Sequence, residues 1–357
     1  MEPGRIAEFL KDCGEPEFRV RQILRALCAG VSSYDEITTL PRALRKRLSD
    51  SLPMLSFKVE RALSTSNGSS HKAVLRLTDG QMIETVLMSP KPGLWSVCVS
   101  SQVGCALKCN FCATGLMGFK RNLSAEEITD QVLWWRQFLR GSASGASGTV
   151  SAQSVRSRAR GGEISNVVYM GMGEPMLNFE AVKKSIERLC DPGLFGFGRR
   201  SIAVSTAGVV PGIARFSKEC PQVHLALSLH SANNILRTQL MPINKAYPIE
   251  DLVKSLRRYF ARNKRKVFLE YVLLDGENDQ LRHVQELVRF IHRVGPVHLL
   301  HVNLIIWNPT RTPHHSSERL VAAQFKRYLF DHGIHVTIRK NLGQEINGAC
   351  GQLVIPE

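Results

Sequence analysis

The second half of the chain alternates between short apolar strands and helical patterns, and this alternation restricts its fold more than any other feature. The segments that read as strands are residues 97–99, 166–170, 201–205, 225–230, 266–274, 301–306 and 335–339. Counted from the first of these, they make six strand–helix repeats. Such alternation predicts an α/β protein with a parallel sheet and helices outside it.

Polar residues follow several of these strands directly. Glu174 lies in a Gly-rich turn, Ser205 and Ser228 end the next two strands, with His230 close behind, and Asn308 follows a later one. Parallel α/β folds place their sites at this edge of the sheet. Each residue alone is more often a polar group that caps a loop. Four such positions around one edge nevertheless predict a polar ligand site, in which the Glu174 carboxylate suits an ammonium group.

Three cysteines after the first strand stand at the spacing C-x3-C-x2-C. They are Cys105, Cys109 and Cys112, and Cys98 lies seven residues upstream of the first. Thiolates are the preferred ligands of iron–sulfur clusters, and a four-iron cluster normally takes four of them. Three ligands leave one iron open, which is typical of a catalytic metal site rather than a sealed one.

Structural zinc and inert thiols are the alternatives for this loop. A structural zinc site needs four ligands, commonly in C-x2-C pairs. Here no second C-x2-C pair and no nearby histidine completes the set. The chain has nine cysteines, an odd number without a framework spacing, so a reducing compartment is favoured over a disulfide scaffold. The N-terminus lacks an apolar signal core, and no apolar run approaches the ~18 residues of a membrane span. We therefore expect a cytoplasmic protein that does not associate with a membrane.

The charge balance points to a polyanionic partner. Lys and Arg number 47 against 31 Asp and Glu, for a formal charge of +16 and a pI near 9.7. Nucleic acid fits such a charge better than a small acidic metabolite does, although simple solubility is the alternative. Residues 1–53 read as short amphipathic helices, and the basic face of residues 42–47 is either solvated or in contact with phosphate.

Two further segments flank the repeats. Residues 54–90 read as three strands joined by turns at Asn67-Gly68 and Asp79-Gly80, with Glu84 inside an apolar strand. Residues 141–162 are small, polar and basic, which predicts a flexible surface insertion. Near the C-terminus, in residues 342–357, Cys350 lies between small residues, so its thiol is either a free surface cysteine or a nucleophile.

Taken in order, seven motifs resemble those of one known family. They are C-x3-C-x2-C followed by residues 118–123, the turn at 171–175, Ser205-Thr206, Ser228-Leu229-His230, residues 240–244, Trp307-Asn308-Pro309 and residues 349–353. This set resembles the RlmN/Cfr family of radical S-adenosylmethionine (SAM) enzymes, which methylate an adenine of 23S ribosomal RNA. The resemblance runs from about residue 5 to 353. It implies a partial (β/α)6 TIM-like barrel at 91–341, with the helices of 1–53 as an RNA-binding accessory domain and 54–90 as a β-hairpin extension.

The resemblance also assigns roles to individual residues. Cys105, Cys109 and Cys112 would hold a [4Fe–4S] cluster, and two SAM molecules would be used per turnover. The residues that match the family's SAM contacts are Gly173, Glu174, Ser205, Ser228, Leu229, His230 and Asn308. Cys350 would carry the methyl group, Cys98 would be the resolving thiol, and Glu84 would accept a proton. The implied partners are 23S rRNA, tRNA and an electron donor such as flavodoxin or ferredoxin, and we expect a monomer.

Two branches of the family compete. RlmN-like enzymes methylate C2 of adenine and also resemble enzymes that act on a tRNA adenine beside the anticodon, whereas Cfr-like enzymes methylate C8 and confer antibiotic resistance. Pro175, Val209-Val210-Pro211 and residues 307–309 favour the first branch; the short N-terminus, residues 191–195 and residues 333–339 favour the second. We favour C2 methylation.

One segment departs from the family pattern. An acidic run usually precedes the methylated cysteine, but here it reads Gly343-Gln344-Glu345-Ile346-Asn347-Gly348-Ala349, with one acid left and Gly348 in place of alanine. An answer of another class is a non-catalytic RNA-binding Fe–S protein. Cys98 and Cys350 argue against it, because neither is needed to hold a cluster.

Overall fold

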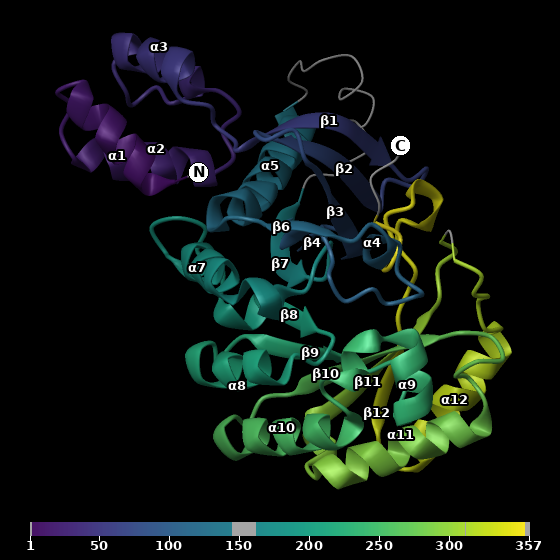
Figure 1. Ribbon diagram of the computed structural model, residues 1–357. Coiled ribbons are helices and arrows are strands. Elements are labelled where there is room, and N and C mark those ends of the chain that lie inside the picture. Colours follow the sequence, from purple (N-terminus) through teal and green to yellow (C-terminus); the bar gives the residue numbers. More distant parts are fainter. Residues whose placement is uncertain (1, 145–161, 311, 354–357) are drawn as a thin grey trace.

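A single sheet of ten strands forms the centre of the protein (Figure 1). The computed structural model describes residues 2–144, 162–310 and 312–353. The strands follow the order β1-β2-β3-β4-β7-β8-β9-β10-β11-β12. From β4 to β12 all neighbours are parallel, and a helix-bearing connection joins each parallel strand to the next. The predicted α/β fold with a partial barrel is confirmed.

The elements of the barrel lie close to the predicted ranges. The parallel strands are β4 (Leu94–Cys98), β7 (Glu163–Tyr169), β8 (Ile202–Thr206), β9 (His224–Ser228), β10 (Val267–Leu273), β11 (Leu300–Ile306) and β12 (His335–Ile338). The longer helices between them are α5 (Ala125–Ser144), α7 (Phe179–Cys190), α8 (Val210–Glu219), α9 (Asn234–Leu240), α10 (Ile249–Arg262), α11 (Leu281–Val294) and α12 (Arg319–Asp331). Ser124 and Glu127 form a capping box at the start of α5, each side chain accepting the other's backbone N–H.

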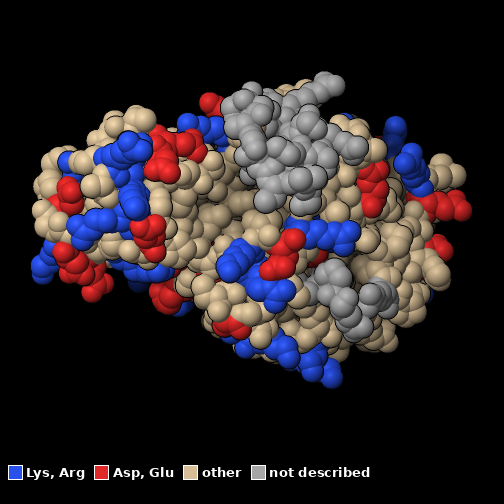
Figure 2. Space-filling model, turned by 90° about the horizontal axis from the view of Figure 1, so that it is seen from above, with Lys and Arg blue, Asp and Glu red and all other residues tan. Residues whose placement is uncertain are grey.

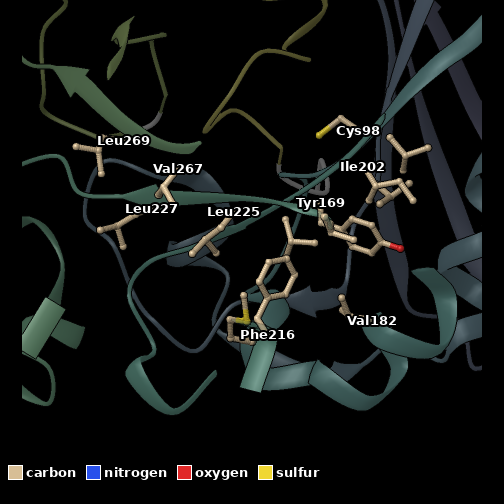
Figure 3. Packing of buried hydrophobic residues seen from close by; sticks show 14 of the residues in the cluster. Cys98, Tyr169, Val182, Ile202, Phe216, Leu225, Leu227, Val267 and Leu269 are labelled. Carbon is tan, nitrogen blue, oxygen red and sulfur yellow. The ribbon is translucent and has the colours of Figure 1, made fainter. Parts of the chain in front are cut away.

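The two faces of the barrel sheet differ in burial. Leu225, Leu227, Val267 and Leu269 are fully buried and pack against helix side chains such as Phe216, as Figure 3 shows. Successive strand residues point to opposite faces, so the residues between them face the inside of the barrel. Many of those inner residues are only partly buried. The barrel strands therefore have a dry outer face under the helices and an inner face that polar groups can occupy.

The strands before the barrel belong to the same sheet. They are β1 (Phe57–Ser64), β2 (Ser70–Leu77) and β3 (Met82–Lys91), and they pair in antiparallel fashion up to β4. The sequence suggested a boundary at Pro90, but β3 continues through this proline and turns back into β4. Pro90 is accommodated because it is exposed and lies at an irregularity in the pairing of β3 with β4, between Met88 and Lys91.

The N-terminal helices form a small unit with its own core. They are α1 (Pro3–Asp12), α2 (Phe18–Cys28) and α3 (Arg42–Ser51), with a short 3₁₀ turn at Tyr34–Glu36. Leu44 and Leu48 of α3 are buried in this core, which fits the amphipathic pattern of these helices. Arg136 of α5 donates to the carbonyl oxygen of Cys28 at 2.6 Å, which fixes the unit beside the barrel helices. Within the described residues no helix is long and apolar enough to cross a membrane. Most of the predicted insertion at 141–162 lies outside the described residues.

Candidate active site

The polar residues at the carboxyl ends of the strands line one cavity. It holds about 940 Å³ of space free of protein atoms, including the part open to solvent. The predicted residues that line it are Cys105, Cys109, Cys112, Gly173, Glu174, Ser205, Ser228, His230, Asn308 and Cys350. The structure thus gathers ten of the thirteen predicted site residues. Leu229, Cys98 and Glu84 are buried and do not line it.

The three cysteines lie in the loop between β5 (Gln102–Gly104) and α4 (Ala113–Leu116). Their side chains pack against an apolar cluster that includes Phe111 and Trp307, and the Trp307 indole N–H donates to the carbonyl oxygen of Phe111 at 3.2 Å. Burial raises the pKa of Cys105 to about 12 and raises that of Cys109 and Cys112. The thiols therefore hold their protons until a metal group displaces them. Among the described residues no three His, Cys, Asp or Glu side chains converge on a single metal ion, whereas a cluster takes each thiolate at a different iron.

Glu174 links two strand ends. It follows β7, and its carboxylate accepts the backbone N–H of Met176 at 3.0 Å and of Ala207, after β8, at 2.8 Å. The side chain of Gln102 accepts the N–H of Glu174 at 2.8 Å. Burial raises the pKa of Glu174 to about 6, so the carboxylate is poised to take a cationic partner in the cavity.

Ser205, Ser228, His230 and Asn308 supply the other polar groups. The hydroxyls of Ser205 and Ser228 are 3.2 Å apart on neighbouring strands. Burial lowers the pKa of His230 to about 3, and its neutral ring accepts the backbone N–H of Val272 through Nδ1. The side-chain N–H of Asn308 donates to the carbonyl oxygen of Cys350 at 3.1 Å, while its Oδ1 is buried without a hydrogen-bond partner in the described structure. An unpaired buried oxygen in this lining fits a ligand that donates to it.

A buried arginine that the sequence did not single out holds these loops together. Arg237 of α9 is fully buried and donates to the carbonyl oxygens of Ala207 and Leu229 and to the side chain of Asn244. These bonds link the loop that follows β8 to the loop that follows β9. They therefore help to hold Ser228 and His230 in position. Burial lowers the pKa of Arg237 only to about 10, so it remains charged at neutral pH.

Cys98 and Cys350 lie near Arg339 and Glu270, two further residues that the sequence did not single out. Burial raises the pKa of both thiols, that of Cys98 to about 12, and a charge on Cys350 raises the pKa of Cys98 further. Arg339 acts in the opposite direction on both, and its guanidinium is 3.2 Å from the Glu270 carboxylate. The Cys350 side chain is exposed and lines the cavity. The Arg339 cation thus offsets part of the effect of burial on these two thiols.

Glu84 lies outside the cavity in a buried ion pair. Its carboxylate is 2.8 Å from the ammonium group of Lys72, and both side chains are nearly inaccessible to water. Because Val86 pairs with Lys72 on one side and with Cys98 on the other, Glu84 and Cys98 face the same side of the sheet. An acid inside an apolar strand marked Glu84 in the sequence, and the same signal marks Glu270 on β10.

The loop before Cys350 packs on the β-hairpin extension. The Glu345 carboxylate, the one acid left in this loop, accepts hydrogen bonds from the backbone and hydroxyl of Ser66. A Cβ added to Gly348 would meet nothing closer than 3.4 Å, with Lys72 at 3.5 Å. An alanine would therefore fit, and the loop departs from the family pattern without a steric need for glycine.

The chain is similar to several known proteins over most of its length. The pattern of the Radical SAM superfamily matches residues 99–291. A protein from Chloroflexus aurantiacus named "Probable dual-specificity RNA methyltransferase RlmN" is 44% identical, over 98% of this chain and 90% of its own. A Cfr-named ribosomal RNA methyltransferase from Lachnoclostridium phytofermentans is 36% identical, over 98% and 96%. The crystal structure of a radical SAM methyltransferase from Sphaerobacter thermophilus is 40% identical, covers 99% of this chain with 97% of its own, and superposes with a TM-score of 0.85.

These matches extend over nearly the whole chain, and their sequence identities of 36–44% are high enough to assign the family. The chain belongs to the RlmN/Cfr family of radical SAM RNA methyltransferases. Its cofactors are a [4Fe–4S] cluster and SAM. The residues present fit both groups, because three thiols stand in one loop and the unpaired Asn308 Oδ1 and the Glu174 carboxylate face the adjoining space.

Proposed function

We propose that this protein methylates C2 of an adenine in 23S rRNA, with a tRNA adenine beside the anticodon as a second substrate. The observation that carries the proposal is the pair of thiols, Cys98 and Cys350, beside Arg339 at the edge of the cavity that holds the three-cysteine loop. A cluster needs neither thiol, so the pair serves another step. The RlmN-type turn at Pro175 and the RlmN-named relative at 44% identity support C2 as the target atom.

The cofactors supply a methyl group and, from a second SAM, a radical able to remove a hydrogen atom from carbon. Cys105, Cys109 and Cys112 would hold the cluster. Glu174 would take the SAM ammonium group, and Ser205, Ser228, His230 and Asn308 would line the rest of the site, with Gly173 and Leu229 as backbone contacts. The Glu174 carboxylate suits this task because two backbone N–H groups already fix its orientation.

The chain's own residues would carry the methyl group. The Cys350 thiolate would take it and become a thioether. After loss of a hydrogen atom, its methylene radical would bond to the adenine ring carbon; Glu84 would then accept the proton of that carbon, and the unpaired electron left on the ring would return to the iron–sulfur group, from which the radical step drew one electron. The Cys98 thiolate then attacks the sulfur of Cys350. An S–S bond forms, the C–S bond breaks, and the electron pair left on carbon takes a proton to complete the methyl group. A ring carbon that is not nucleophilic requires such a route.

A Cfr-like reaction at C8 is the second candidate, supported by the Cfr-named relative and by residues 191–195 and 333–339. The deciding experiment reconstitutes the protein with iron and sulfide, adds SAM, a reductant and unmodified rRNA or tRNA, and separates the digested nucleosides by mass spectrometry. We expect 2-methyladenosine from 23S rRNA. If 8-methyladenosine is the only product, the target atom is C8 and the C2 assignment is wrong. If neither RNA yields methylated adenosine, the proposed function is refuted.

The helical unit of residues 1–53 is proposed to contact RNA. Arg42, Lys46 and Arg47 are exposed on α3, whereas Arg45 donates to the carbonyl oxygen of Asp35. Figure 2 shows acidic side chains between the basic ones over these helices. We expect this unit to assist in holding RNA rather than to supply most of the binding energy.

A further inference from the structure

The amino ends of the barrel strands carry a concentration of cations. Seven lie there: Arg199, Arg200, Arg258, Arg262, Lys264, Arg265 and Lys266. The first two directly precede β8, the last three directly precede β10, and the remaining two are in the end of α10. Because β8, β9 and β10 are parallel neighbours, their amino ends lie side by side. The edge is therefore opposite the one that holds the catalytic cavity.

None of these seven cations forms an ion pair with a described residue. Glu219, which acts with Arg199 on the neighbouring Cys220, is bound instead by Lys183 and Arg215. Six of the seven are exposed, and Arg265 is half-buried. Unpaired cations on one surface repel one another, so a fold that gathers them gains from an anionic partner. This differs from α3, where acidic residues lie among the basic ones.

Four aromatic rings lie in a row beside these cations, on the inner face of the sheet. His224 contacts Phe268, with ring centres 5.6 Å apart; Phe268 contacts His301 at 5.7 Å; and His301 stacks on His335 at 6.4 Å with the planes 7° apart. All four rings are at least partly exposed. Burial, and next the charge of Arg265 for His224 and of Lys266 for His301, lowers the pKa of these two histidines. Neutral rings of this kind offer faces on which bases stack.

We propose that the amino-terminal edge of the barrel is a second RNA-binding surface, in which the seven cations contact phosphates and the ring row stacks unpaired bases. The proposal rests on the proposed function, because it takes the RNA substrate as the occupant. Cations beside exposed aromatic rings are the combination that single-stranded RNA recognises. On β10, Phe268 of the ring row lies two residues, about 7 Å, from Glu270 in the cavity lining, whereas Lys266 lies six residues, about 20 Å, from Val272 deeper in that lining. A large folded RNA covers such a span.

An acidic redox protein is the competing occupant, since it too would be attracted by the charge. The distance argues against it. A reductant must bring its electron close to the three-cysteine loop, and that loop lies at the opposite edge of the strands. The ring row also has no role in attracting an acidic protein surface, whereas it has one in binding bases.

The test compares two triple variants of the full-length protein, each losing three charges. Arg262→Gln/Lys264→Gln/Lys266→Gln changes the proposed surface, and Arg289→Gln/Arg319→Gln/Lys326→Gln removes exposed cations from α11 and α12. Binding of labelled 23S rRNA transcript is measured between about 50 and 200 mM salt. We expect the first variant to bind at least about tenfold more weakly and to lose about three units of the salt slope, and the second to keep wild-type binding. Equal losses in both variants, or none in the first, would overturn the proposal.

A ring variant separates stacking from charge. Phe268→Leu keeps an apolar side chain and removes the ring; we expect about tenfold weaker binding of single-stranded RNA with an unchanged salt slope. An unchanged affinity would remove the ring row from the proposal. If the first triple variant slows only turnover driven by flavodoxin, and not turnover driven by dithionite, the surface belongs to a reductant and the proposal is wrong. RNA binding that depends on this surface in a protein that methylates no RNA would instead refute the proposed function alone.

Discussion

The residues at the two ends of the barrel strands differ in burial and in how their charges are compensated. At the carboxyl ends, Glu174, His230 and Arg237 are buried and their hydrogen-bonding partners fix their positions. At the amino ends, Lys264 and its neighbours are exposed and form no ion pair with described residues. Buried polar groups act through exact partners and low dielectric, whereas exposed charges act through their number and are screened by salt. Substitutions should therefore abolish chemistry at one end and weaken binding by degrees at the other.

The largest effect is expected at Cys350. Cys350→Ala removes the atom that would carry the methyl group, so we expect no methylated adenosine in nucleoside mass spectrometry. RNA affinity should stay close to wild type, because the binding surface lies elsewhere. Cys190→Ala, which changes a half-buried thiol outside the cavity, is the matched control and should retain activity. Methylation by Cys350→Ala would contradict the proposed mechanism.

A large effect is also expected at Glu84, although it lies outside the cavity. Glu84→Gln keeps the shape of the side chain but cannot accept a proton, and we expect methylation to fall by about 100-fold or more. The change also leaves the Lys72 ammonium group buried without its carboxylate, which costs on the order of 3–5 kcal/mol of stability. Rate and thermal unfolding must therefore be measured on the same samples.

The double variant Lys72→Met/Glu84→Gln separates the two roles. Removing both charges restores a neutral interior, so we expect the unfolding temperature to recover while methylation stays low. Recovery of both stability and methylation in the double variant would show that Glu84 is needed for folding and not for proton transfer.

Much of the carboxyl-end site follows from local sequence patterns. A polar residue directly after an apolar strand predicted where Glu174, Ser205 and Ser228 lie, because parallel strands end at a common edge. The cysteine spacing likewise predicted the ligand loop. The proposed pairing of Cys98 with Cys350 came from the family resemblance alone, since they lie 252 positions apart and no local pattern brings them together.

The residues that the sequence did not single out contact partners that are distant along the chain. Arg237 reads as an ordinary solvent-facing residue of a short helix, yet it is fully buried because it bridges the loops after β8 and β9. Glu270 and Arg339 pair only once β10, β11 and β12 are side by side. The cations of the amino ends were counted in the net charge, but only the sheet order shows that two separate clusters form one surface.

A moderate effect is expected from pH at His71, which is buried on β2 against Trp95 and Phe138. Burial lowers its pKa from 6.5 to about 4. The folded protein then binds fewer protons than the unfolded chain, so stability is present above pH 6.5 and is lost as the pH falls toward 4. Between pH 7 and pH 5 this amounts to about 2 kcal/mol.

Urea unfolding at the two pH values measures this loss. In His71→Gln the pH-dependent loss should shrink by that amount, since glutamine does not titrate and can still bond to Ser64, whose hydroxyl is 2.5 Å from the histidine ring. His335→Gln, changed at an exposed ring of the amino-terminal edge, is the control and should keep the wild-type difference. An identical loss in wild type and His71→Gln would mean that other groups control the acid sensitivity.

The smallest effect is expected from one exposed cation. Lys264→Gln should lower the salt slope of RNA binding by about one unit and weaken affinity a few-fold near 0.1 M salt, because one phosphate contact is lost. In steady-state methylation the change should appear in KM for RNA, with kcat retained, since saturating RNA refills the site. A fall in kcat with KM unchanged would mean that the amino ends of the strands influence the chemistry some 20 Å away. The two ends would then have to be treated as one coupled site, because a screened surface charge has no direct means of reaching a buried reaction centre.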